Sequence, residues 1–129
     1  MRVALMILLG LVIGVIGTVN VMNTLAERNP MPKAVMHTMG YHMGALGKAL
    51  KAKQCDSAKI QHHLDRMQST ATDIVPVFGT PEKDFTDHAE SLQTRLREAL
   101  AAAPADCAAL ALVVKPINDA CKSCHEKYR

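Results

Sequence analysis

Near its C-terminus the chain reads Cys121-Lys122-Ser123-Cys124-His125, and this C-x-x-C-H segment limits the possible folds more than any other feature. The spacing is that of covalent haem attachment, in which both cysteines form thioethers with the porphyrin and the histidine ligates the iron. A chain with this segment has to enclose a large, flat cofactor. The motif therefore predicts one haem c per chain, held by Cys121 and Cys124, with His125 as the proximal iron ligand.

Two other uses of paired cysteines fit the sequence less well. A thioredoxin-type C-x-x-C follows a strand and opens a helix, where the helix dipole lowers the thiol pKa, whereas this motif closes a helical pattern. A structural zinc site needs a second pair of clustered ligands, and the remaining cysteines, Cys55 and Cys107, stand far apart.

Composition supports a buried cofactor and excludes some partners. The 129 residues include two Tyr, two Phe and no Trp, so large core-filling side chains are scarce and a porphyrin would supply the missing apolar bulk. The net charge is only +3, without the basic runs of a nucleic-acid-binding protein. No catalytic triad, carboxylate pair or phosphate loop accompanies the motif, so we expect no enzymatic activity.

Residues 1–26 are predicted to be a membrane anchor or signal segment, followed by a haem-binding domain over residues 27–129. Residues 3–26 carry no charge, and a helix of that length reaches about 36 Å, enough to cross the hydrocarbon layer. The length of the apolar run favours a retained inner-membrane anchor, and the alternative is a signal peptide cleaved near Ala26. Either way we expect the rest of the chain on the periplasmic side, where disulfides form.

Apolar residues at steps of three and four predict four helices after the anchor, over about 33–53, 56–75, 80–103 and 105–128. Asp56 is the expected N-cap of the second helix, and Thr80 and Pro81 are expected to start the third. The predicted inward stripes are Met36, Met39, Met43, Leu46 and Leu50; Ile60, Leu64, Met67, Ala71 and Ile74; Phe85, Ala89, Leu92, Leu96 and Ala99 or Leu100; and Leu110, Val113 or Val114, Ile117, Cys121, Cys124 and Tyr128.

Short connections between helices of this length predict an all-α fold, an antiparallel up-down-up-down four-helix bundle. Its first helix then begins at the end where its fourth helix finishes, so Met36 lies level with His125. The turn that contains Phe78 lies at that end too. Gly40 and Gly47 share the inward face with Met36, which suggests close approach by the haem or by a partner helix in a homodimer.

These residues resemble the class II c-type cytochromes, which include cytochrome c-prime and its methionine-ligated low-spin relatives. The resemblance covers residues 30–129 and rests on the C-terminal motif, the helix order and Met36-His37-Thr38-Met39-Gly40. It implies that Met36 lies over the distal face of the haem as a sixth iron ligand. Pro32 departs from the basic residue common in that family, although Lys33 is adjacent, and Pro116 predicts a kink in the haem-bearing helix.

The other histidines are not predicted as ligands. His37 is the nearest rival of Met36, but at about 100° per residue it points away from the buried stripe, as His42 does, so both are expected on the surface. We expect the remaining three to be solvated: His62, His63 and His88.

Cys55 and Cys107 fall in the first and third connections, which an antiparallel bundle places together at the end away from the haem. We therefore expect a disulfide between them. Closing this loop of 52 residues stabilises the fold by at most about 4 kcal/mol on the chain-entropy model. The alternative is two separate buried thiols.

The predicted function is electron transport, because histidine and methionine ligation suits reversible one-electron exchange and raises the reduction potential. The alternative is a five-coordinate module with an open distal site that binds NO or CO, and a third possibility is a structural bundle without haem. Expected partners are redox proteins, including a membrane-bound quinol-oxidising or terminal oxidase complex near the anchor. The cations that could steer an acidic partner are Lys115, Lys122, Lys127 and Arg129, although a simply solvated face fits equally well.

Overall fold

The computed structural model describes residues 2–26, 29–80 and 82–129, and every regular element in these ranges is a helix. The chain divides into two compact units, Met1–Pro30 and Met31–Arg129. The all-α prediction is therefore confirmed. Pro81, which we expected at the first position of a helix, lies outside the described residues.

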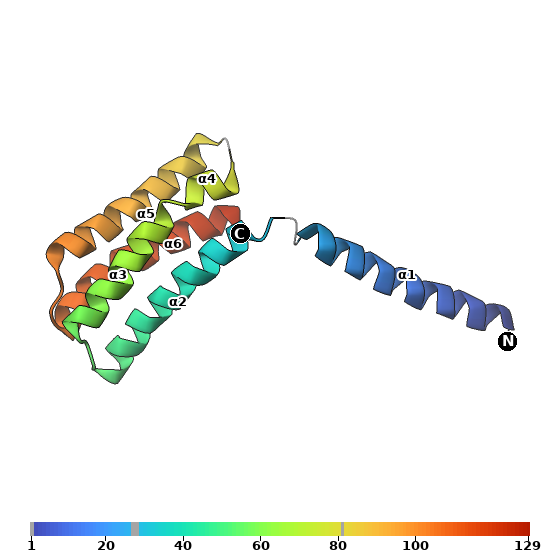
Figure 1. Cartoon of the computed structure of the whole chain (residues 1–129), viewed down its shortest axis with the longest axis horizontal. Coiled ribbons are helices and arrows are strands. Elements are labelled where there is room, and N and C mark those ends of the chain that lie inside the picture. Colours follow the sequence, from blue (N-terminus) through green and yellow to red (C-terminus); the bar gives the residue numbers. More distant parts are fainter. Residues whose placement is uncertain (1, 27–28, 81) are drawn as a thin grey trace. The chain divides into compact units, whose positions relative to one another are not determined.

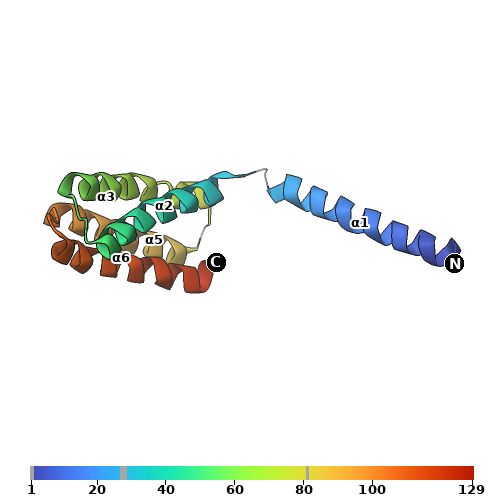
Figure 2. The same ribbon diagram turned by 90° about the horizontal axis from the view of Figure 1, so that it is seen from below.

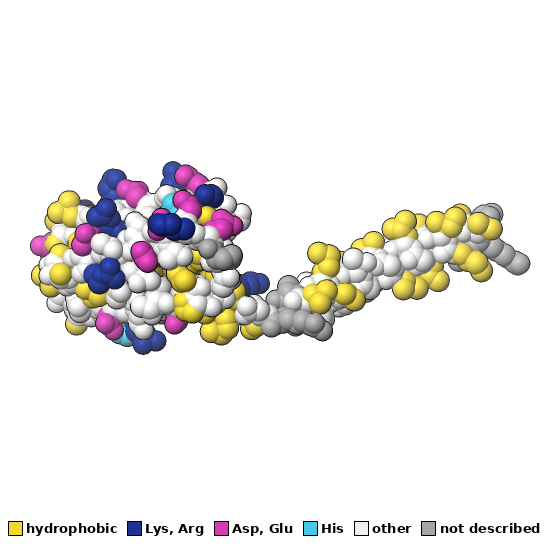
Figure 3. Space-filling model, turned by 90° about the horizontal axis from the view of Figure 1, so that it is seen from above, with side chains coloured by type: hydrophobic (Ala, Val, Ile, Leu, Met, Phe, Trp, Pro, Cys, Tyr) yellow, Lys and Arg dark blue, Asp and Glu magenta, His cyan; other side chains and the backbone are white. Residues whose placement is uncertain are grey.

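The first unit consists of α1 (Arg2–Ala26), whose segment Met6–Leu25 is long and apolar enough to cross a membrane. Hydrophobic side chains cover α1 along its length in Figure 3, and none of this segment is buried within the protein. Some of its polar side chains bond to the helix itself: Thr18 Oγ1 donates to the Gly14 carbonyl and Asn20 Nδ2 to the Ile16 carbonyl. Such internal bonds reduce the cost of placing these groups in lipid.

The second unit contains four long helices and one short helix that share a single hydrophobic core (Figure 1). Helix α2 packs on α3, α3 on α5 and α5 on α6, and α2 also contacts α6, as both views show (Figure 2). Their bounds are α2 Met31–Ala52, α3 Ser57–Ala71, α4 Ile74–Phe78, α5 Lys83–Ala102 and α6 Cys107–Tyr128.

The predicted stripes of α3 and α5 form the core. Leu64 and Met67 on α3 and Leu96 on α5 are fully buried, and Leu110 and Ile117 supply the corresponding positions of α6. Burying each such side chain contributes about 1.5–3 kcal/mol. The inner residues of α6 beyond Ile117 are only half-buried, so the core opens towards the end of this helix.

One predicted helix start is confirmed, one was not predicted and one differs from the prediction. The Asp56 carboxylate accepts a bond from Lys59 N, as predicted, and Asp106 caps α6 in the same way. The prediction that Thr80 caps the third long helix is wrong, because α5 begins at Lys83 after Glu82. The short helix α4 intervenes and includes Pro76 in its first turn, where a backbone N–H has no intrahelical partner in any case.

Cys55 and Cys107 are joined in a disulfide, with their Cα atoms 5.1 Å apart. The bond links the end of the α2–α3 connection to the first residue of α6. Helix α6 continues through Pro116 without interruption, and the kink expected there stays a prediction.

His42 is buried, so its predicted surface position is wrong. Its side chain is 7% exposed, and its Nδ1 lies 2.9 Å from Nδ1 of His63 on α3, so one ring donates a hydrogen bond to the other. His63 is itself half-buried rather than solvated. The reason is that α2 packs more extensively on α3 than on α6, which turns its buried face towards α3 and leaves Met36 and Met43 at the edge.

This histidine pair predicts a loss of stability in mild acid. Burial, followed by the neighbouring His63, His62 and Arg66, lowers the pKa of His42. Burial and then His62 lower the pKa of His63. In the unfolded chain both groups titrate near 6.5, so below that pH the unfolded state binds more protons. We expect the free energy of unfolding to fall as the pH drops through about 6.5 towards the lowered folded pKa values.

Urea unfolding between about pH 7.5 and 5.5 measures this dependence. The variant His42→Leu should have a shallower pH profile than the wild type, whereas His37→Asn, which replaces an exposed ring, should keep the wild-type slope. Equal slopes in the wild type and His42→Leu would contradict the prediction.

Candidate haem site

The C-x-x-C-H motif occupies the last turns of α6. Cys124 and His125 follow Cys121 by three and four residues. Their side chains therefore lie on the same face of the helix as that of Cys121. Both cysteines are free thiols and half-buried, and His125 is exposed. All three line the smaller of two adjoining cavities, which has a volume of about 160 Å³.

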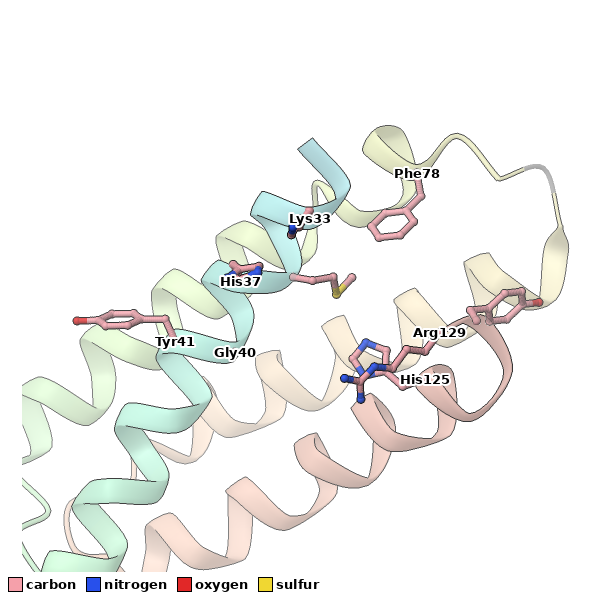
Figure 4. Close-up of a pocket in the computed structure, with 9 residues that line it drawn as sticks. Lys33, His37, Gly40, Tyr41, Phe78, His125 and Arg129 are labelled. Atoms are coloured by element: carbon pink, nitrogen blue, oxygen red, sulfur yellow. The ribbon is translucent and has the colours of Figure 1, made fainter. Parts of the chain in front are cut away.

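The larger cavity, of about 830 Å³, lies between the first turns of α2, the short helix α4 and the end of α6. Figure 4 shows the His125 ring on the side of α6 that faces α2, with Phe78 of α4 beyond it. Met36, Gly40 and His125 line both cavities. The volume is within the range of ligand and cofactor sites.

The structure thus brings together all of the residues that the sequence predicted for the site: Met36, Gly40, Phe78, Cys121, Cys124 and His125. Met36 is half-buried, as are Phe78 and the two cysteines. His37 also lines the larger cavity, although its ring is exposed as predicted.

The chemistry of the walls fits a haem. The smaller cavity is mostly apolar and includes four methionines, Met36, Met39, Met43 and Met67, which suits a porphyrin ring. Lys33 and Arg129 line the larger cavity and could pair with the two carboxylates of a haem. At Gly40 an added Cβ would meet no protein atom within 4 Å, so this position leaves space for a ligand.

The thiols do not have the properties of a redox-active cysteine pair. Burial, and next the neighbouring Cys124, raises the pKa of the Cys121 thiol. Burial and then Asp84 raise the pKa of Cys124. Reactive C-x-x-C thiols have lowered pKa values at helix N-termini, whereas these thiols lie near a helix C-terminus.

A cluster at the start of α5 holds the end of α6. Tyr128 Oη lies 2.9 Å from Asp84 Oδ2 and 3.0 Å from Glu82 Oε2, and Lys127 Nζ donates to Asp84 at 2.8 Å. Burial, followed by bonds to these two carboxylates, raises the pKa of Tyr128 to about 12. The Lys127 bond, followed by the Tyr128 bond, lowers the pKa of Asp84. The cluster therefore connects the turn that follows His125 to the start of α5.

His88 lies in the site, so its predicted solvated position is wrong. It is half-buried, lines the smaller cavity and has its Nε2 3.5 Å from Asp84 Oδ2. The sequence contained the signal for this placement, because His88 is three residues after Phe85 and four before Leu92 on the inward stripe of α5.

The cations near this end are largely paired with carboxylates. Lys115 contacts Asp119 at 2.8 Å and Lys122 approaches Glu126 at 3.8 Å, and Lys127 is held by Asp84. These exposed pairs contribute little to stability, but they reduce the positive potential of the surface.

Within residues 2–26, 29–80 and 82–129, no three His, Cys, Asp or Glu side chains gather to hold a metal ion by themselves. A haem iron does not need such a cluster, because the porphyrin supplies four of its ligands. Comparison of the chain with protein-family models, with characterised proteins and with solved structures gives no match.

The position of Gly40 on the wall of both cavities predicts a position-specific effect on cofactor binding. Gly40→Leu would extend a side chain from the cavity wall, so we expect a several-fold lower haem content per chain, measured by absorbance against protein concentration. Gly44→Leu is the matched control, because Gly44 is on the same helix with open space around it and lines neither cavity. Equal haem content in both variants would show that the ring does not lie against Gly40.

Proposed function

We propose that residues 27–129 are an exported electron-transfer domain of the class II c-type cytochrome kind, an antiparallel four-helix bundle with one covalent haem. The observation that supports this proposal most strongly is that Met36 of α2 lines the same two cavities as His125 of the C-x-x-C-H motif. Four methionines and the apolar walls around them support it further.

In this proposal each residue of the site has a defined role. Cys121 and Cys124 attach the cofactor through thioethers, and His125 ligates the iron through its imidazole. Met36 provides a soft thioether ligand on the opposite side, which favours the reduced state and so raises the potential. The bound haem supplies reversible one-electron chemistry, and the protein controls its orientation, ligands and exposure to water.

The apolar helix α1 supports export and a position at a membrane. Its segment Met6–Leu25 has a mean hydropathy of 2.0 and no buried surface, so it suits either a retained anchor or a signal segment. We propose the periplasmic side of the inner membrane, with the anchor retained. Redox partners there would be membrane-bound quinol-oxidising or terminal oxidase complexes.

A second candidate function is the binding of NO or CO at a five-coordinate iron. The size of the larger cavity favours it, because the cavity leaves room beside Met36 for a small ligand. The two functions differ in whether Met36 occupies the sixth coordination position.

Covalent attachment can be tested on the exported protein. We expect the intact mass to equal the chain plus one haem, and the colour to stay with the protein in acidified acetone. The double variant Cys121→Ser, Cys124→Ser should lose covalent haem, while Cys55→Ser, Cys107→Ser, which removes the disulfide, should keep it. Free extraction of haem from the wild type would refute the proposal.

Ligation by Met36 can be tested with Met36→Ala. We expect loss of the sulfur-to-iron charge-transfer band, a shift of the iron towards high spin and binding of carbon monoxide. The reduction potential should also fall, by an amount within the range of roughly 0.8 V over which axial ligands set haem potentials. His37→Ala is the control, because His37 lines the same cavity but points off the buried stripe, and it should leave all four properties unchanged. The reverse pattern would assign the distal position to His37.

A further inference from the structure

A pair of hydrogen-bonded histidines, with a third histidine nearby, lies at the contact of α2 with α3, outside the candidate haem site. His42 is on α2 and His62 and His63 are on α3, and none of them lines either cavity. The ring centroids of His42 and His63 are 5.2 Å apart, and those of His42 and His62 are 6.2 Å apart. The proposed electron-transfer function does not use these rings.

The His42 and His63 rings turn the same nitrogen towards each other, with their Nδ1 atoms 2.9 Å apart. Two imidazole nitrogens bound to one metal at 2.0–2.1 Å are about 2.9 Å apart when their bonds meet at a right angle, and about 3.4 Å apart in a tetrahedral site. A hydrogen bond between the rings accounts for the observed separation, and the same separation also fits neighbouring positions of a tetragonal or octahedral ion, which is the preference of Cu²⁺ and Ni²⁺.

We propose that His42 and His63 form a binding site for a tetragonal or octahedral divalent transition metal, which joins α2 to α3. Two nitrogens come from the protein, and water completes the coordination on the solvent side of the half-buried His63. In the metal-free pair one Nδ1 carries the shared hydrogen. On metal binding that ring moves its proton to Nε2, so both rings ligate as neutral imidazoles and the net charge changes only by that of the ion.

The surroundings both favour and limit this site. Burial lowers the pKa values of both histidines, with a further contribution from His63 and His62 at His42 and from His62 at His63, and this favours the neutral form that metals require. The Tyr41 ring lies edge-on to both, with centroid distances of 5.0 and 6.3 Å, and so covers part of the pair. Arg66 places a positive charge near His42, which weakens the binding of any cation.

The test uses the haem-containing full chain without a histidine tag, and Ni²⁺ as the probe because it does not exchange electrons with haem under these conditions. Equilibrium dialysis at about pH 7.5 should give one saturable Ni²⁺ per chain, bound at least as tightly as Zn²⁺. Ni²⁺ should also raise the unfolding temperature, because it binds the folded state. Absence of saturable Ni²⁺ binding would overturn the proposal, and tighter Zn²⁺ binding would overturn the right-angle geometry.

Variants separate the pair from a general histidine-rich surface. His42→Asn and His63→Asn should each weaken Ni²⁺ binding by roughly tenfold or more, since even outer-shell changes at metal sites cost this much. His62→Asn is the matched control and should keep the affinity, and Arg66→Gln should increase it several-fold. If His42→Asn fails to fold, Ni²⁺ binding by His63→Asn provides the test, because His63 is only half-buried. Equal loss in His62→Asn and His63→Asn would overturn the assignment.

Discussion

The candidate haem site depends on one constraint, which is that the first turns of α2 and the last turns of α6 line the same space. Thioethers from Cys121 and Cys124 would fix the ring to α6, and His125 on the same face would take one side of the iron. A ligand for the other side has to come from a different helix. The register of α2 alone decides whether Met36 lies level with His125. The proposed chemistry therefore depends on the packing of two helices that are far apart in sequence.

The smaller cavity is mostly apolar, and the charged side chains line the larger one. The methionines lie around the smaller cavity, and Lys33 and Arg129 line the larger one. Tyr128, Lys127 and Asp84 bind one another just beyond His125, which ties the end of α6 to the start of α5. This distribution suits a flat cofactor with an apolar ring and two acidic groups.

Much of this arrangement follows from local patterns in the sequence. The Asp56 cap and the buried faces of α3 and α5 can be predicted from local helix patterns alone. To predict that Met36, Phe78 and His125 come together, one also needs the rule that short connections reverse the chain. The failures have another origin. His42 is a polar residue at the edge of an apolar stripe, so its burial depends on which neighbouring helix packs more extensively on α2, a tertiary effect. His88 is different, because its position between Phe85 and Leu92 on the inward stripe was already visible in the sequence. The third long helix starts later than expected, because the residue before its first position is Glu82, in an extended conformation, and not Thr80.

The absorption spectrum of the purified wild-type protein, recorded oxidised, reduced and reduced with carbon monoxide, tests the central claim most directly. We predict a low-spin haem c spectrum in which the ferric form has the sulfur-to-iron charge-transfer band and the reduced form does not change on addition of carbon monoxide. A high-spin spectrum with ready carbon monoxide binding would contradict Met36 ligation and favour gas binding. A spectrum without haem would contradict the whole account.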